Sequence, residues 1–139
     1  MVSVIIPFFN AESTLTRAIA SVIECDTVSE IILINDGSTD NSLCIAKQYL
    51  KINSGIKLLH HPNETNMGAS ASRNLGLQYC SCDWVQFLDA DDELLPGKIN
   101  IQLKFVDKNV CFIVGNSIFK SSIDSKKKII SGKDPWVGL

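Results

Sequence analysis

Short apolar runs of strand length alternate with stretches of helical periodicity, and this alternation constrains the fold more than any other feature. Strands are predicted over residues 2–8, 30–35, 56–60, 84–88 and 110–119, with an edge hairpin over 118–130. The helices predicted between the first strands reach about residues 23, 50 and 79, and Asn10 is predicted to cap the first of them. This repeat predicts an α/β fold, a three-layer sandwich with a mostly parallel central sheet.

The composition is typical of a small globular protein. With 139 residues, of which 45% are hydrophobic and 20% charged, the chain is predicted to form a single domain over residues 1–139. A net charge of −2 argues against nucleic acid as a partner, and no apolar run approaches the roughly 20 residues of a membrane helix. The five scattered cysteines are predicted to be reduced, and the first residues do not resemble a secretory signal, so we predict a cytoplasmic protein.

The strand predicted over residues 84–88 runs directly into a group of acids. Asp89, Asp91 and Asp92 follow it, and ligands of open α/β sheets bind at the carboxyl ends of the strands. Neighbouring carboxylates in a partly closed cleft need a proton or a cation among them, and their hard oxygens favour Mg²⁺ or Mn²⁺. We therefore predict a divalent cation that bridges these acids and a diphosphate. The alternative is that the acids only cap the next helix.

Two further polar segments follow predicted strands. Asp36 can accept a hydrogen bond from a base N–H, and a neighbouring glycine lets a ligand approach the backbone closely. The small residues 68–72 at a helix start can direct backbone N–H groups toward an anion, to which Arg73 adds a permanent charge. Helix capping and close packing are the alternative interpretations. Because these strand ends should meet at one edge, beside Pro7, they predict a pocket for a nucleoside diphosphate.

Familiar phosphate-binding motifs are absent from the sequence. It contains no Gly-x-x-x-x-Gly-Lys-Ser/Thr motif, and no Gly-x-Gly-x-x-Gly follows the first predicted strand. These absences argue against an ordinary kinase or NTPase and against an NAD- or FAD-binding protein. A nucleotidyltransferase is also disfavoured, because residues 8–11 offer no glycine-rich, basic loop. The nucleotide must therefore be held in another way.

Four segments together resemble a family 2 glycosyltransferase of the GT-A fold. They are VSVIIPFFNAESTL from residue 2, INDGSTDNS at 34–42, NMGASASRNLGL at 66–77 and FLDADDEL at 87–94. The match runs in order from residue 2 to about residue 97. Many members of the family are bacterial enzymes that build cell-surface polysaccharides. The resemblance therefore implies that the chain is the N-terminal, nucleotide-sugar-binding part of such an enzyme.

The resemblance also implies roles for individual residues. Asp36 would bind the base, usually uracil, while Pro7 and Phe8 would lie at the edge of the nucleotide pocket. Asp89 would contact the ribose or the metal, and Asp91 would ligate Mn²⁺ or Mg²⁺ on the diphosphate. The nucleotide-binding residues predicted in all are Pro7, Phe8, Asp36, Gly68, Arg73 and Asp89, and the predicted metal ligands are Asp91 and Asp89.

The implied activity is inverting transfer of a sugar from a nucleotide-diphosphate sugar, a UDP-sugar by family habit, to an acceptor hydroxyl. A metal ion would stabilise the leaving diphosphate, and a carboxylate would deprotonate the acceptor. In the family this base lies downstream, so we expect it beyond Leu139, with the acceptor-binding half largely absent and the sheet truncated at its C-terminal side. The late residues Asp124 and Asp134 are interpreted as turn residues.

Two functional hypotheses follow from this resemblance. The first is a metal-dependent glycosyltransferase of cell-surface polysaccharide or glycoconjugate synthesis, and the second is a non-catalytic fragment that binds a sugar nucleotide. The expected partners are the nucleotide-sugar donor and a saccharide or lipid-linked acceptor. The full enzyme is expected to associate peripherally with the inner face of the membrane, and an exposed sheet edge would favour a homodimer.

Overall fold

The computed structural model describes residues 1–106, 113, 117–119 and 128–130, and its contacts divide the chain into two compact units, residues 1–98 and 99–139. The prediction of one domain over the whole chain stays a prediction. The first unit contains β1 (Val2–Phe8), α1 (Leu15–Ile23), β2 (Val28–Asn35), α2 (Ser42–Ile52), β3 (Ile56–His60), the 3₁₀ turn η1 (Pro62–Glu64), α3 (Ala69–Tyr79) and β4 (Trp84–Phe87).

The second unit is described only in part. Helix α4 (Lys98–Leu103) begins at the last residue of the first unit, and β5 (Ser117–Phe119) pairs antiparallel with β6 (Lys128–Ile130). This pairing agrees with the hairpin predicted over 118–130. Most of the strand predicted over 110–119, and the late aspartates Asp124 and Asp134, lie outside the described residues. In the part of the chain that the structure describes, no helix is both long and apolar enough to span a bilayer.

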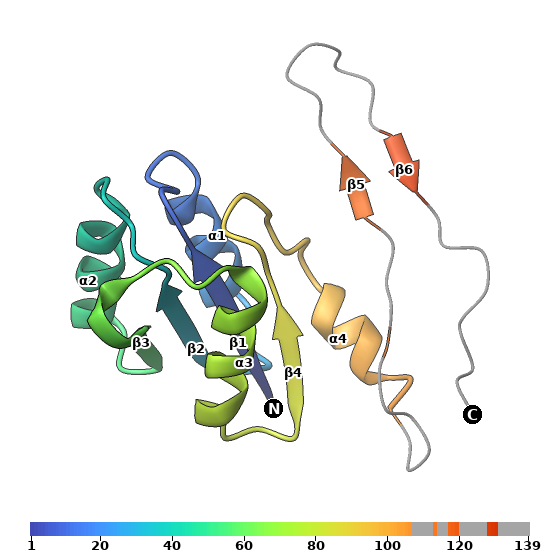
Figure 1. Ribbon diagram of the computed structural model, residues 1–139. Helices are drawn as coiled ribbons and strands as arrows, with labels where there is room; N and C mark the ends of the chain where they lie inside the picture. Colours follow the sequence, from blue (N-terminus) through green and yellow to red (C-terminus); the bar gives the residue numbers. More distant parts are fainter. Residues whose placement is uncertain (107–112, 114–116, 120–127, 131–139) are drawn as a thin grey trace. The chain divides into compact units, whose positions relative to one another are not determined.

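The sheet of the first unit has four strands in the order β3-β2-β1-β4, all parallel (Figure 1). Strand β1 lies inside the sheet, and all seven of its residues are buried. Its apolar run continues on both faces, which is the pattern of a parallel strand covered on both sides. The parallel arrangement brings the carboxyl ends of all four strands to the same end of the sheet, which is called its carboxyl edge below.

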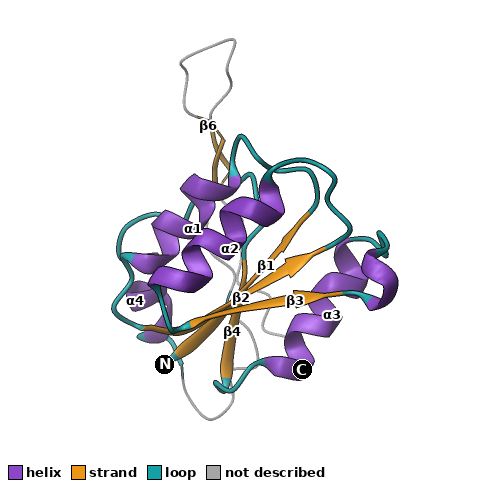
Figure 2. Ribbon diagram, turned by 90° about the vertical axis from the view of Figure 1, so that its left-hand side faces the viewer, coloured by secondary structure: helices purple, strands orange, loops and turns teal. Residues whose placement is uncertain are grey.

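Helices cover both faces of this sheet, with α1 and α2 on one face and α3 on the other (Figure 2). On the first face α1 buries Leu15, Ala18, Ile19 and Val22, the residues at helical spacing in the sequence. On the other face α3 approaches closely at Gly76, where a Cβ atom would lie 2.6 Å from the Cγ2 atom of Ile5. The predicted three-layer α/β sandwich is therefore confirmed.

A buried carboxylate, that of Glu30, connects neighbouring segments at the amino-terminal end of the sheet. Glu30 of β2 is only 6% exposed, and its Oε1 atom accepts hydrogen bonds from the Ser3 hydroxyl, at 2.5 Å, and from the backbone N–H and hydroxyl of Ser81. Its Oε2 atom lies 2.7 Å from the Lys57 ammonium. Burial by itself would raise the pKa of Glu30, but the hydrogen bonds from Lys57, Ser3 and Ser81 outweigh it and lower the pKa to about 2.

We expect Glu30→Gln to lower the free energy of unfolding at pH 7 by about 1–3 kcal/mol, because a neutral amide loses the charge-assisted bonds. The folded-state pKa of Glu30 lies below its ordinary value of 4.5, so its contribution is fully present above that value and is lost as the pH falls toward 2. Urea denaturation at pH 7 and pH 3 should show a smaller difference between wild type and variant at pH 3. An equal difference at both pH values would show that the charge of Glu30 is not what stabilises the fold.

Candidate functional site

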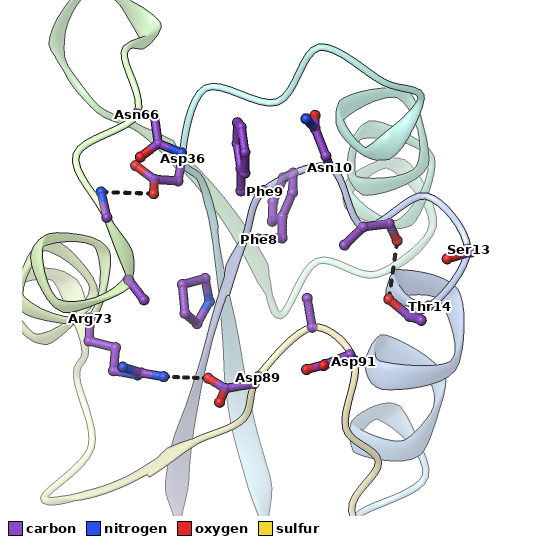
Figure 3. A pocket seen from close by; sticks show the side chains of 15 residues that line it. Phe8, Phe9, Asn10, Ser13, Thr14, Asp36, Asn66, Arg73, Asp89 and Asp91 are labelled. Atoms are coloured by element: carbon purple, nitrogen blue, oxygen red, sulfur yellow. Dashed lines mark hydrogen bonds and ion pairs between the residues drawn. The ribbon is translucent and has the colours of Figure 1, made fainter. Parts of the chain in front are cut away.

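The carboxyl ends of β1, β2 and β4 open onto one pocket of about 590 Å³, within the first unit (Figure 3). This volume is typical of a site for a small molecule or cofactor. Its walls come from residues 7–14, from the end of β2, from the loop before α3 and its first turns, and from the residues after β4. All the predicted site residues line it, namely Pro7, Phe8, Asp36, Gly68, Arg73, Asp89 and Asp91. The structure therefore brings them together, while their individual roles stay predictions.

Asp36 follows β2 directly, and only 4% of its surface is exposed. Its Oδ1 atom accepts the backbone N–H of Met67 at 2.7 Å, and its Oδ2 atom accepts the N–H of Gly68 at 2.9 Å. Its own N–H donates to the carbonyl of Phe8 at 2.9 Å. The carboxylate thus joins the end of β2 to the loop that leads into α3, and each of its oxygens already holds a backbone amide.

Two glycines allow this loop to lie against the end of β2. Gly37 has a φ of +76°, and a Cβ atom there would lie 2.8 Å from both the Asn66 nitrogen and the Glu64 carbonyl oxygen. Gly68 is the N-cap of α3 and has a φ of +87°, a backbone conformation that glycine adopts without steric cost. The first N–H groups of a helix lack partners within the helix, so a helix start on the pocket wall favours an anionic ligand.

A buried pair behind this loop contributes to the site although sequence reasoning did not assign it a role there. His61 is 8% exposed and Ser72 of α3 is fully buried. The Nε2 atom of His61 lies 2.8 Å from the Ser72 hydroxyl and 3.6 Å from the Oδ1 atom of Asp36. The contact holds α3 against the segment that follows β3. No motif spacing indicates it, because the two residues come from different elements and meet only in the tertiary structure.

Arg73 and Asp89 form an ion pair on the pocket wall (Figure 3). Arg73 projects from α3, and Asp89 follows β4 by two residues. The Arg73 side chain is 32% exposed and that of Asp89 is 51% exposed, so both remain accessible to a ligand. A guanidinium has five N–H donors, and Arg73 can therefore contact a phosphate while it keeps its bond to Asp89.

The acids after β4 carry negative charge that their neighbours only partly neutralise. Burial raises the pKa of the Asp92 carboxyl, and the charges of Asp91 and Asp89 raise it further, against an opposing effect of Lys98. Across residues 1–106 and the short described segments beyond them, no three His, Cys, Asp or Glu side chains gather into a complete metal site. Asp89 and Asp91 both line the pocket, and their role as the two carboxylate ligands of a Mg²⁺ or Mn²⁺ ion, with phosphate oxygens and water as its other ligands, stays a prediction.

The aromatic residues at the end of β1 divide between the core and the pocket. Phe8 lines the pocket but is only 2% exposed, whereas Phe9, which was not predicted, lines it with 49% of its surface exposed. Asn10 has a φ of +48°, and its Oδ1 atom accepts the N–H of Thr39 at 2.8 Å. The prediction that Asn10 caps the first helix is wrong, because α1 begins at Leu15 and Asn10 instead fixes this segment to the loop after β2.

Comparison with known proteins identifies the family and the fold. The sequence matches the family described as Glycosyl transferase family 2 over residues 3–133, and the chain therefore belongs to this family. The parallel sheet with helices on both faces is the GT-A type of fold that the resemblance implied. The family and the fold that the sequence motifs predicted are therefore both confirmed.

Two curated relatives illustrate the relationship. The uncharacterized glycosyltransferase YibD of Escherichia coli K12 is 46% identical over 95 residues, which cover 68% of this chain and 27% of the relative. The Escherichia coli enzyme WfgD, named as a UDP-Glc:alpha-D-GlcNAc-diphosphoundecaprenol beta-1,3-glucosyltransferase, is 36% identical over 118 residues, which cover 84% of this chain and 45% of WfgD. The chain thus spans between about a quarter and about half the length of these relatives.

Two solved structures share the fold. Residues 1–349 of Staphylococcus aureus TarS, crystallised with UDP-GlcNAc, are 28% identical with a TM-score of 0.67, and the match covers 78% of this chain and 31% of that 1–349 chain. The mannosyltransferase PcManGT from Pyrobaculum calidifontis, in complex with GDP-Man and Mn²⁺, is 19% identical with a TM-score of 0.71. That match covers 78% of this chain and 33% of PcManGT. At that identity the second likeness concerns the fold alone.

We expect Gly37→Ala to destabilise the protein by more than Gly97→Ala. Both glycines have a positive φ, +76° and +74°, but only at Gly37 would a Cβ atom meet backbone atoms, since nothing lies within 4 Å of one at Gly97. The conformational strain common to both should cost about 1 kcal/mol, and the clash at Gly37 should add about 1–3 kcal/mol. Urea denaturation of the two variants measures the difference, and equal losses would show that the loop yields without cost.

Proposed function

We propose that this chain binds the donor substrate of an inverting glycosyltransferase, which transfers a sugar from a nucleotide-diphosphate sugar to an acceptor hydroxyl. The observation that carries the proposal is one pocket that combines an exposed aromatic ring, a cationic side chain at a helix start and a pair of acids. Membership of glycosyl transferase family 2 supports it. The name of WfgD and the ligand of the TarS crystal support a UDP-sugar as the donor.

The base would bind at the end of the pocket where Phe9 lies near Asp36 and Asn66 (Figure 3). The Phe9 ring, which is 49% exposed, offers a face for stacking, and stacking on a base covers apolar surface that is now in water. Asn66 adds a side-chain amide that can both donate and accept hydrogen bonds. The nucleoside would therefore be held by one ring face and a small number of polar groups.

The diphosphate would bind between the start of α3 and the acids after β4. Arg73 supplies a permanent positive charge there, and the backbone of Gly68 and Ala69 forms part of the same wall. Asp91, with Asp89, would hold a Mn²⁺ or Mg²⁺ ion, which when bound stabilises the negative charge of a departing diphosphate. Arg73 would contribute to the same stabilisation, because its positive charge would face the leaving diphosphate. The ion pair with Asp89 already holds the Arg73 side chain in place.

The acceptor is proposed to be a saccharide or lipid-linked saccharide of cell-surface polymer synthesis. The name of WfgD supports this, since it pairs UDP-Glc with a GlcNAc carried on diphosphoundecaprenol. The residue that deprotonates the acceptor is proposed to belong to an acceptor-binding half and not to the pocket described above. What this chain's own residues contribute is donor binding and the neutralisation of the leaving group.

Isothermal titration calorimetry with UDP, in MnCl₂ and then in excess chelator, tests the proposal directly. Wild-type protein should bind UDP more tightly with Mn²⁺ than in chelator. Incubation with UDP-GlcNAc or UDP-Glc, followed by measurement of released UDP, then separates a catalytic domain from a part that only binds the donor. If UDP binds neither in MnCl₂ nor in chelator, the proposed function is refuted.

Asp91→Ala should remove the effect of Mn²⁺ on UDP affinity. In MnCl₂ the affinity should fall by about 10- to 100-fold, because a charged ligand of the cation is lost, whereas in chelator it should equal that of wild type. Glu93→Ala is the matched control, since it removes the same charge two residues away but from a side chain that does not line the pocket. If Mn²⁺ still enhances UDP binding to Asp91→Ala, the assignment of Asp91 to the metal is wrong.

Phe9→Ala should weaken UDP binding by about 1–3 kcal/mol through the loss of base stacking. Tyr79→Ala serves as the control, because Tyr79 is 52% exposed, much like Phe9, but does not line the pocket. Calorimetry in MnCl₂ measures both variants against wild type. Affinities that fall equally in the two variants, or in neither, would exclude Phe9 as the stacking residue.

A further inference from the structure

Seven hydrogen bonds join the loop after β1 to the loop after β2, and we term this set the interloop clasp. It connects residues 10–12 with residues 38–42, segments that lie about 30 residues apart in the chain. Every bond of the clasp has a side chain as donor or acceptor. The clasp therefore depends on the identity of these side chains, and a single substitution can remove one of its bonds.

In one direction of the clasp, three successive backbone N–H groups of the first loop donate to side chains of the second. The N–H groups of residues 10, 11 and 12 reach the Ser38 hydroxyl at 3.1 Å, the Ser42 hydroxyl at 2.8 Å and the Asp40 Oδ2 atom at 3.0 Å, respectively. Loop amides that would otherwise bond to water thus have fixed partners in the protein. The backbone that follows Phe9 is therefore held at three consecutive residues.

In the other direction, side chains of the first loop accept backbone N–H groups of the second. The Asn10 Oδ1 atom accepts the N–H of Thr39 at 2.8 Å, and the Glu12 Oε2 atom accepts the N–H of Asn41 at 3.0 Å. Each loop therefore fixes the other, and neither can move alone without breaking these bonds. Asn10 takes part in both directions, since its backbone donates and its side chain accepts.

Phe9 lies directly between two fixed residues on the pocket wall (Figure 3). Before it, the Phe8 side chain is buried and the Phe8 carbonyl accepts the Asp36 N–H at 2.9 Å. After it, Asn10 has a φ of +48°, a left-handed conformation that asparagine tolerates better than most residues. Because Phe9 is 49% exposed, packing holds its ring only in part, and the direction of the ring depends on this backbone.

We propose that the interloop clasp positions Phe9 for the base of the nucleotide, with Asn10 and Asp40 as its positioning residues. Both act on the backbone that follows Phe9, and so hold the ring at the pocket wall before a ligand arrives, which lowers the conformational entropy lost when the base stacks. This inference rests on the proposed function in taking a nucleobase to bind at Phe9. It goes further by giving a role in binding to Asp40, which does not line the pocket.

Three substitutions of Asn10 separate its backbone conformation from its side-chain bond. Asn10→Asp keeps an acceptor for Thr39 and tolerates a positive φ, Asn10→Gly keeps only the conformational freedom, and Asn10→Ala keeps neither. Calorimetry in MnCl₂ with UDP and with inorganic pyrophosphate, which has no base, gives the ratio of the two affinities. That ratio should change by less than about twofold in Asn10→Asp and should fall by about 3-fold in Asn10→Gly and about 10-fold in Asn10→Ala. An unchanged ratio in Asn10→Ala would overturn the proposal.

Asp40→Ala tests the clasp from outside the pocket wall. Its UDP affinity should fall by about 3- to 10-fold while its pyrophosphate affinity stays within about twofold of wild type, because the lost bond to the Glu12 N–H loosens the loop that carries Phe9. Asp26→Ala is the matched control, since it removes the same charge from an exposed turn before β2, at the opposite end of that strand from the pocket. If Asp40→Ala does not fold, Asp40→Asn, which keeps one acceptor oxygen, replaces it with a smaller expected loss. Equal losses for both ligands, or none, would contradict the proposal.

A double-mutant cycle with Phe9→Ala tests the route. If Asn10 and Asp40 act through Phe9, then Asn10→Ala and Asp40→Ala should cause at most about a twofold further loss of UDP affinity once the ring is absent. A residue that only stabilises the fold would weaken UDP binding whether or not the ring is present. Losses as large as in the wild-type background would therefore show that the two residues do not act through Phe9.

Amide hydrogen exchange on the ligand-free protein tests the clasp apart from the proposed function. The N–H groups of residues 10–12 should be protected in wild type and should exchange faster in Asn10→Ala and Asp40→Ala. Unchanged exchange in both variants would show that the clasp does not fix this loop. If wild type binds neither UDP nor pyrophosphate, the proposed function is refuted, while the exchange rates still decide whether the clasp holds the backbone after Phe9.

Discussion

The parallel pairing of β1 with strands on both sides is the constraint on which the rest of the first unit depends. Every residue of β1 is buried, β2 pairs with it along its whole length, and β4 pairs with its first half. Because all four strands run in one direction, every crossover returns over a face of the sheet, and every strand ends at the same edge. The pocket is a consequence of this arrangement, since polar residues that follow separate strands have nowhere else to converge.

The walls of the pocket are held by side chains that bond to the backbone of neighbouring loops. Asn10 binds the Thr39 amide, Asp40 binds the Glu12 amide, and Asp36 binds the amides of Met67 and Gly68. Short polar side chains suit this purpose because they can replace the regular backbone partners that a loop lacks. The site is thus built from loops, but its geometry is fixed by hydrogen bonds between segments that are about 30 residues apart in the chain.

The carboxylates at the two ends of the sheet differ in how their charges are balanced. At the amino-terminal edge Glu30 is neutralised by Lys57 and accepts hydroxyl and amide donors, so no ligand is needed to balance its charge. At the carboxyl edge Arg73 pairs with Asp89, while the charges of Asp91 and Asp89 help to raise the pKa of Asp92. A structural carboxylate has its charge balanced by partners inside the protein. In a ligand site part of the charge is left for the bound ligand to balance.

The sequence by itself determined the α/β class, the parallel sheet and the residues that meet at its carboxyl edge, because strand periodicity and parallel topology depend on local patterns. Family motifs likewise identified Asp36, Arg73, Asp89 and Asp91 as pocket residues. Only the tertiary structure decided that Phe9 faces the pocket while Phe8 is buried, that Asn10 joins two loops without capping α1, and that His61 meets Ser72. These features arise from contacts between segments that the sheet brings together, and no local pattern records which atoms a buried side chain will reach.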